Sequence, residues 1–337
     1  MVAVMAPSMG EKQFWGCCVG IETSAMRHVP FPKIPVASSA TVAANGIWIA
    51  TEKIHGAQLV IAYDGRQLRI GKRKAWLRGE EAFFGWQLLR AELERAARTA
   101  LSLGGTVVRI YGELYGGHYP HADVEPMPGV SAVQTGVWYS PGLRFALFDV
   151  LRHDHLDDAG LFLPYTDVAA VAAAAGLDVV PILGRAPRHE LDALPLRFPT
   201  RVPCLHGLPD IPGNFAEGIV MRPDISATAE QRPIIKMKIE EFDEQRFDES
   251  RPWNQHTQLA LNDLRRLAQA MVNKPRLDSA RSKTGPGSFS EFMDEVVLDV
   301  MVDITDAFPA AMAALGDGEE DELHTYLREV VQAMCHE

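Results

Sequence analysis

The alternation of apolar and polar residues divides the chain into a strand-rich part and a helical part. Two short apolar runs, at residues 47–50 and 59–63, have the length of strands, and the hairpin signal Asp64-Gly65 follows the second. Four further runs have the same character, at residues 106–114, 144–150, 217–221 and 234–238. We expect the last two runs to pair as one hairpin.

Helical spacing of apolar residues occurs twice before residue 243 and dominates after it. The predicted helices span residues 80–103, 166–175, 257–272, 288–308 and 319–334. Ser288 and Glu291 have the spacing of a capping box, which favours a helix start at that point. Residues 115–143 and 274–287 show no period, and we predict loops there.

These elements predict an α+β protein, in which antiparallel sheets flanked by helices precede a small all-α domain. The 337 residues are 47% hydrophobic, enough for one large core or two smaller ones. Prolines disfavour regular structure just before the first strand. We therefore predict a lead-in segment over residues 1–30, a main domain over residues 31–248 and a helical C-terminal domain over residues 249–337.

Composition excludes several classes of protein. No run of 18 apolar residues occurs, and residues 1–10 lack the pattern of a signal peptide, so we expect a soluble, cytoplasmic protein with no membrane segment. The four cysteines show no Cys-x-x-Cys spacing, and the adjacent pair Cys17-Cys18 is poorly suited to zinc. Reduced thiols are therefore expected.

The net charge of −11 argues at first against binding to nucleic acid. However, residues 290–337 hold thirteen of the 44 acidic residues and only one of the 33 basic residues. The rest of the chain is nearly neutral, so the objection applies to the C-terminal helices alone. Residues 274–287 carry a net charge of +3 and could contact phosphates, whereas the acidic helices should pack on the core or bind a protein.

Lys53 stands at the predicted end of the first strand. A surface lysine there is often only a solubility device, but a lysine can also act as a nucleophile if it loses its proton. Its reference pKa of about 10.4 makes that loss depend on nearby cations or burial. Arg73, Lys236 and Lys238 are candidate cations. The last two are two residues apart on a predicted strand and so reach one face.

The chain has neither a Gly-x-x-x-x-Gly-Lys loop nor a Gly-x-Gly-x-x-Gly turn, so side-chain cations would have to hold any nucleotide phosphates. Glu113 lies in an apolar run, where a carboxylate needs a partner or solvent. Phe148 alternates with Phe145 and Leu147 along a predicted strand, where most phenylalanines are core residues. Glu113 could equally belong to a structural salt bridge.

Six short segments, in order, resemble the motifs of the covalent nucleotidyltransferases, which include the ATP-dependent ligases and the mRNA capping enzymes. The segments are Lys53-Ile54-His55-Gly56, Gly71-Lys72-Arg73, Tyr111-Gly112-Glu113-Leu114, Phe145-Ala146-Leu147-Phe148-Asp149, Glu217-Gly218-Ile219-Val220 and Lys236-Met237-Lys238. Glu52 before the lysine, together with Phe83-Phe84-Gly85, is typical of the RNA ligase 2 family of nick-sealing RNA ligases. The resemblance covers about residues 30–245 and implies an ATP-grasp-like nucleotidyltransferase fold.

The resemblance implies a catalytic role for Lys53 and a metal-binding role for Glu217, which could also pair with Lys53. It implies that Glu113 contacts a ribose hydroxyl, that Phe148 stacks on the base and that Lys238 contacts the α-phosphate. The implied nucleotide-binding residues are Glu52, Ile54, Gln58, Arg73, Glu113, Phe148, Lys236 and Lys238. The family usually has asparagine where this chain has Gln58, which changes the reach of the amide by one methylene group. The implied cofactors are ATP and Mg²⁺ or Mn²⁺.

The implied reaction joins an RNA 3′-hydroxyl to a 5′-phosphate through lysyl-AMP and RNA-adenylate intermediates, at nicks in a duplex. A DNA ligase or a capping enzyme would normally add an OB barrel of short strands after the last lysine motif, whereas residues 250–337 have helical spacing. The remaining alternative is an inactive relative that only binds nucleotide or RNA. The intact lysines and carboxylates of the motifs favour an enzyme.

Overall fold

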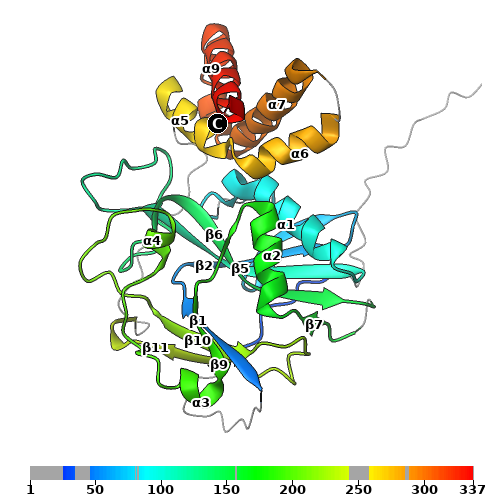
Figure 1. Ribbon diagram of the computed structural model, residues 1–337. Coiled ribbons are helices and arrows are strands. Elements are labelled where there is room, and N and C mark those ends of the chain that lie inside the picture. Colours follow the sequence, from blue (N-terminus) through cyan, green and yellow to red (C-terminus); the bar gives the residue numbers. More distant parts are fainter. Residues whose placement is uncertain are drawn as a thin grey trace, which may run out of the picture.

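The computed structural model describes residues 26–34, 46–79, 81, 83–155, 158–242, 258–284 and 288–336. Figure 1 shows a strand-rich body with a group of helices from the C-terminal part of the chain stacked on one end of it. The expected lead-in segment up to residue 25 and the expected domain boundary near residue 248 lie outside the described residues. None of the described helices is long and apolar enough to cross a membrane.

The first sheet carries the lysine motifs. Its strands follow the order β11-β10-β1-β9, and every neighbouring pair is antiparallel. The bounds are β1 (Ile47–Lys53), β9 (Ile182–Pro187), β10 (Gly218–Pro223) and β11 (Ile235–Lys238). Gly218 lies opposite Lys53 on one side and opposite Lys238 on the other. The predicted hairpin of β10 and β11 is confirmed, and its register brings both lysines beside the residue that precedes Gly218.

The second sheet follows the order β4-β3-β2-β5-β6-β7, with β8 pairing in parallel to β6. The bounds are β2 (Ala57–Tyr63), β3 (Leu68–Lys72), β4 (Ala75–Trp76), β5 (Val107–His118), β6 (Ser140–His153), β7 (Leu161–Phe162) and β8 (Asp178–Val179). Alternate residues such as Leu59, Phe145 and Leu147 form a core against two helices. The opposite face of the same strands carries Gln58, Glu113 and Phe148.

Those two helices are α1 (Arg90–Ser102) and α2 (Tyr165–Ala175). The prediction of one helix over residues 80–103 was wrong in its first half, because Phe84 and Gly85 take positive φ values of 53° and 76°. A short 3₁₀ turn, η3 (Trp86–Leu89), then precedes α1. The end of α2 is as predicted: Gly176 closes the helix with a φ of 72°.

The prediction of a loop over residues 115–143 was also too long. Strand β5 continues to His118 and β6 begins at Ser140. Gly116 and Gly117 lie in the stretch predicted to be a loop. Both take positive φ values, but they belong to an irregular part of the β5–β6 ladder. Glycine thus bends the strand here without ending it. Short helical turns complete this part of the chain at α3 (Arg188–Leu191), α4 (Val202–Leu205) and η4 (Glu240–Phe242).

The C-terminal part is helical, as predicted, with α5 (Leu261–Met271), α6 (Lys274–Thr284), α7 (Phe289–Ala307), α8 (Pro309–Met312) and α9 (Asp317–His336). The capping box of Ser288 and Glu291 is confirmed at the start of α7. The prediction of a basic loop over residues 274–287 was wrong, because residues 274–284 form α6. Arg276 of that helix is 1% exposed, so it is not available to RNA phosphates.

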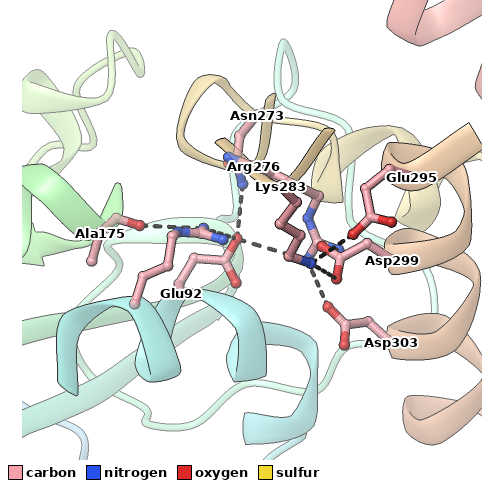
Figure 2. A network of polar contacts seen from close by, with 9 residues as sticks. Glu92, Ala175, Asn273, Arg276, Lys283, Glu295, Asp299 and Asp303 are labelled. Atoms are coloured by element: carbon pink, nitrogen blue, oxygen red, sulfur yellow. Dashed lines mark hydrogen bonds and ion pairs between the residues drawn. The ribbon is translucent and has the colours of Figure 1, made fainter. Parts of the chain in front are cut away.

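Arg276 is the centre of a buried network that joins the C-terminal helices to α1 (Figure 2). Its guanidinium donates to Asp299 Oδ2 at 2.9 Å and to Asp303 Oδ2 at 2.6 Å, both on α7. It also lies 4.0 Å from Glu92 Oε1 of α1, which accepts a 2.9 Å hydrogen bond from Asn273 Nδ2. These contacts explain why residues 274–284 are helical although their apolar residues have weak helical spacing. The ion pairs with other helices stabilise α6.

Candidate active site

A cleft of about 620 Å³ is lined by residues of both sheets. It contains every residue that the sequence predicts to be the nucleophile or to bind the nucleotide. These residues are Glu52, Lys53, Ile54, Gln58, Arg73, Glu113, Phe148, Lys236 and Lys238. Residues that are far apart in sequence, such as Lys53 and Lys238, which are 185 positions apart, therefore share one cavity.

Glu217 contacts both of the lysines at the strand ends of this cleft, as well as His55. Lys53 Nζ donates to Glu217 Oε2 at 2.6 Å, and Lys238 Nζ lies 2.8 Å from Oε1. His55 Nδ1 is 3.5 Å from Oε2. The carboxylate therefore bridges the last residue of β1 and the last residue of β11, which fixes the positions of the two lysines relative to each other.

The charge of Glu217 follows from these contacts. The side chain is almost fully buried, and burial alone would raise its pKa. The ammonium of Lys53 and hydrogen bonds from His55, Lys238 and Lys53 outweigh burial and hold the pKa of Glu217 well below its usual range. Glu217 is therefore a carboxylate at neutral pH.

The pKa of Glu113 shifts in the opposite direction from that of Glu217. Burial raises the pKa of Glu113 to about 7, although Lys53 and Arg73 favour its ionised form. The nearby charge of Glu217 adds to the rise. Glu113 lies opposite Gln58 in the β2–β5 ladder, so the carboxyl and the amide project from neighbouring strands into the same cleft.

The glycine of the Lys-x-x-Gly motif has a steric role. A Cβ at Gly56 would lie 2.2 Å from the carbonyl oxygen of Leu114 in β5. The chain that leads from β1 to β2 must therefore pass against β5 without a side chain. This close approach to β5 brings Lys53 next to Glu113, which is the neighbour of Leu114 in β5.

Part of the lining of the cleft is apolar. Phe148 meets Phe31 edge to face, with 5.0 Å between the ring centroids, and Val220 and Ile234 complete this wall. Arg222 lies beside them and donates to the carbonyl oxygen of Phe148 at 3.0 Å. The lining of the cleft thus includes apolar side chains as well as charged ones.

Sequence reasoning gave no site role to several residues that line the cleft, although three of them fall in the motif segments quoted above (Lys72, Phe83 and Phe84). The others are Phe31, Pro32, Ile34, Lys74 and Arg222. Lys72, the last residue of β3, and Lys74 flank Arg73, so this run of three cations was a usable signal. Phe31 comes from a proline-rich stretch without periodicity, and no pattern in the sequence indicates that it packs against Phe148.

The charge of the cleft suits an anion. Three acidic side chains line it, namely Glu52, Glu113 and Asp149, against seven basic ones. The basic ones are Lys53, Lys72, Arg73, Lys74, Arg222, Lys236 and Lys238. A lining that combines apolar side chains with an excess of cations matches a ligand with a base and phosphates.

Residues 46–238, more than half of the chain, match the family model described as RNA ligase. The chain belongs to the RNA ligase family. The matched range begins just before β1 and ends at Lys238, so it contains all the motif residues of the cleft.

Among relatives in this family, the mitochondrial RNA-editing ligase 2 of Trypanosoma brucei brucei is 33% identical over 201 residues. The match covers 52% of this chain and 48% of that protein, so the chain spans about half the length of this curated relative. The structure of a Naegleria gruberi RNA ligase mutant with ATP and Mn is similar at a TM-score of 0.39 and 14% identity, over 58% of this chain and 51% of that one. A likeness this weak carries no weight for function.

Proposed function

We propose that this protein is an ATP-dependent RNA ligase that works through a covalent lysyl-AMP intermediate. The observation that carries the proposal is the position of Lys53. Its side chain lines a cleft that has both apolar and basic residues, and its Nζ contacts Glu217, which also contacts Lys238. Membership of the RNA ligase family supports RNA as the substrate.

In the first step Lys53 Nζ attacks the α-phosphorus of ATP. A P–N bond forms, the bond to the pyrophosphate oxygen breaks, and the lysine gives up its proton. Lys236 and Lys238 offset the negative charge that develops on the phosphoryl oxygens. Phe148 stacks on the base, and Glu113 and Gln58 face the ribose, so the α-phosphate is brought to Lys53.

A divalent cation would bind with the nucleotide rather than in a site built by the protein alone. The described residues contain no group of three or more His, Cys, Asp or Glu side chains that could hold a metal. Mg²⁺ is commonly held by one or two carboxylates together with waters and substrate phosphates. Glu217 and Glu113 fit that role, and the ion would neutralise charge on the departing pyrophosphate.

In the later steps the AMP moves from Lys53 to the 5′-phosphate of RNA, and a 3′-hydroxyl then displaces AMP and joins the strands. We expect a nick in a duplex to be the preferred substrate. Outside the acidic C-terminal helices the chain is nearly neutral, so it has little general affinity for a flexible strand, and duplex geometry would supply the positioning.

Two measurements test the proposal. The purified protein is mixed with Mg²⁺ and with ATP, GTP or NAD that carries a label in the nucleoside monophosphate part; we expect labelled protein with ATP only. Sealing is then compared between a nicked duplex with an RNA 3′-hydroxyl and a pair of free single strands at the same salt concentration. Labelling by GTP would indicate a capping-type enzyme, and faster joining of the single strands would reject the preference for nicks.

The alternative of a DNA ligase or capping enzyme with an OB barrel finds no support in the part of the chain that is described beyond Lys238, where the elements are helices. The acidic surface of α7 and α9 favours a basic protein as a further partner over RNA. The compartment also remains a proposal: the sequence favours the cytoplasm, whereas the trypanosome relative is named as mitochondrial.

A further inference from the structure

The side chain of Glu52 makes contacts that differ from those of a nucleotide ligand. It is 1% exposed, although it is the neighbour of Lys53 in β1. One carboxylate oxygen accepts a hydrogen bond from the hydroxyl of Thr200, and the other accepts the backbone N–H of Arg201 at 2.9 Å. Both oxygens thus have protein donors. Neither Thr200 nor Arg201 is among the described residues that line the cleft.

Thr200 belongs to the stretch of chain that carries Glu217. Its backbone N–H donates to the carbonyl of Asn214 at 3.0 Å, and Pro199 pairs with Phe215 as an antiparallel bridge. The N–H of Ala216, the residue before Glu217, donates to Phe198 at 3.0 Å. Residues 198–200 and 214–216 therefore form a narrow ribbon that ends at Glu217.

Strand β1 is consequently tied to this ribbon through two consecutive residues. Lys53 contacts Glu217 at the end of the ribbon, and Glu52 contacts Thr200 and Arg201 farther back along it. The ribbon continues through Glu217 into β10, which pairs with β1, and the contacts of Glu52 add a second attachment farther back along it. The backbone of β1 is also held here, since the N–H of Glu52 donates to Pro181 at 2.8 Å.

We propose that Glu52 is a positioning residue that fixes Glu217 relative to the nucleophile Lys53, and that its carboxylate does not bind the nucleotide. The proposal rests on the proposed function, because it assigns Glu52 to the step in which Lys53 attacks ATP. For ATP to use this carboxylate, it would have to displace two buried protein donors. Leaving such a donor without a partner is unfavourable, because the donor has already lost its hydrogen bonds to water.

The role has a kinetic signature. A nucleotide ligand contributes to ATP binding, so its loss raises the ATP concentration needed for half-saturation. A positioning residue acts on the geometry of attack, where an error of about 1 Å costs roughly a hundredfold in rate. Its loss therefore lowers the rate constant at saturating ATP and leaves the half-saturating concentration nearly unchanged.

The experiment measures single-turnover formation of labelled Lys53-AMP over a range of ATP concentrations. Four variants are compared with the wild type: Glu52→Ala, Glu52→Gln, Thr200→Val and the control Glu94→Gln. Glu94 lies on α1 and pairs with Arg98 on the surface, so its variant should match the wild type. Circular dichroism checks that each variant is folded.

We expect Glu52→Ala to lower the saturating rate constant by about tenfold or more, with the half-saturating ATP concentration within about twofold of the wild type. Thr200→Val removes one of the two hydrogen bonds and should act in the same direction to a smaller extent. Glu52→Gln should restore most of the rate, because its amide oxygen can accept from Arg201 and its amide nitrogen can donate to Thr200.

The inference is overturned if Glu52→Ala raises the half-saturating ATP concentration at an unchanged rate constant, or if it changes neither quantity. If Glu52→Ala does not fold, Thr200→Val decides in the same way, because it keeps the volume of the side chain. A wild-type protein that forms no Lys53-AMP would instead reject the proposed function. Normal labelling in the wild type, in Glu52→Ala and in Thr200→Val would reject the role of Glu52 and leave the proposed function standing.

Discussion

Lys53 Nζ and Glu217 Oε2 lie 2.6 Å apart across the antiparallel pair of β1 and β10. An ammonium in an ion pair is not a nucleophile, so the contact describes a resting state. The lysine must release its proton and turn towards the α-phosphate before it attacks. The same carboxylate contacts Lys238, so a change at Glu217 affects two lysines together.

Replacing Glu217 with glutamine should therefore impair the first step. The amide keeps the size of the side chain but loses the charge that holds Lys53 and Lys238. We expect single-turnover formation of Lys53-AMP to fall by at least roughly tenfold, as for other losses of a preorganised charge. Glu94→Gln provides the matched control on the surface of α1. A rate equal to that of the wild type would show that the ion pairs of Glu217 have no part in the reaction.

Phe148→Leu should weaken the use of ATP more than it weakens the fold. Leucine keeps most of the volume next to Phe31, but a leucine cannot stack on a base. Stacking contributes about 1–3 kcal/mol, so we expect the half-saturating ATP concentration to rise by roughly fivefold or more. Labelling curves over a range of ATP concentrations measure this. Identical curves for the two proteins would make Phe148 an ordinary core residue.

Arg276→Met should destabilise the attachment of the C-terminal helices (Figure 2). The change leaves Asp303 buried without its cation, a situation that typically costs about 3–5 kcal/mol, whereas Glu92 keeps Arg95 at 3.2 Å. Arg265→Met is the matched control, because Arg265 pairs with the exposed Glu322 and should cost about 1 kcal/mol or less. Urea unfolding measures both. Equal losses of stability in the two variants would contradict the importance of the buried network.

Glu52→Gln should change how stability depends on pH. Burial raises the pKa of Glu52 from 4.5 to about 7, against the opposing effects of Thr200 and Arg201, and Tyr139 is a further neighbouring group. A raised carboxyl pKa stabilises the folded state below pH 4.5, and this contribution is lost as the pH rises through about 7. The loss amounts to at most about 3 kcal/mol.

The glutamine variant should therefore lose less stability than the wild type between pH 4.5 and 7. Glu113 also has a raised pKa, so the variant keeps part of the pH dependence. Urea unfolding at several pH values measures the two slopes. A variant whose slope equals that of the wild type would mean that the folded state does not shift the pKa of Glu52.

Much of the site could be predicted from the sequence because its residues lie in short strands with regular alternation. Lys236 and Lys238 are two positions apart in β11 and both line the cleft. The Asp64-Gly65 signal correctly marked the turn between β2 and β3. Where the local pattern and the tertiary structure agree, the sequence was enough to predict the element, as the capping box of Ser288 predicted the start of α7.

The remaining features depend on contacts that sequence patterns do not encode. The helix α6 exists despite weak periodicity because Arg276 is buried among carboxylates of another helix. Phe84 falls within the helical spacing of the sequence but takes a positive φ, as does Gly85, which delays the start of α1. Phe31 reaches the cleft only because its segment packs on Tyr111 and Phe148, far along the chain. The contacts of Glu52 likewise involve a partner 148 positions away.

The most direct test of the account is covalent labelling of Lys53. Wild-type protein, Lys53→Ala and Lys53→Arg are each incubated with Mg²⁺ and ATP labelled in the α-phosphate, and the labelled residue is identified by peptide mapping. We expect one AMP on Lys53 of the wild type and no labelling of either variant, with circular dichroism unchanged because Glu217 keeps Lys238 as a counter-ion in both variants. Labelling that persists in a folded Lys53 variant, or that maps to another residue of the wild type, would contradict the assignment of the nucleophile.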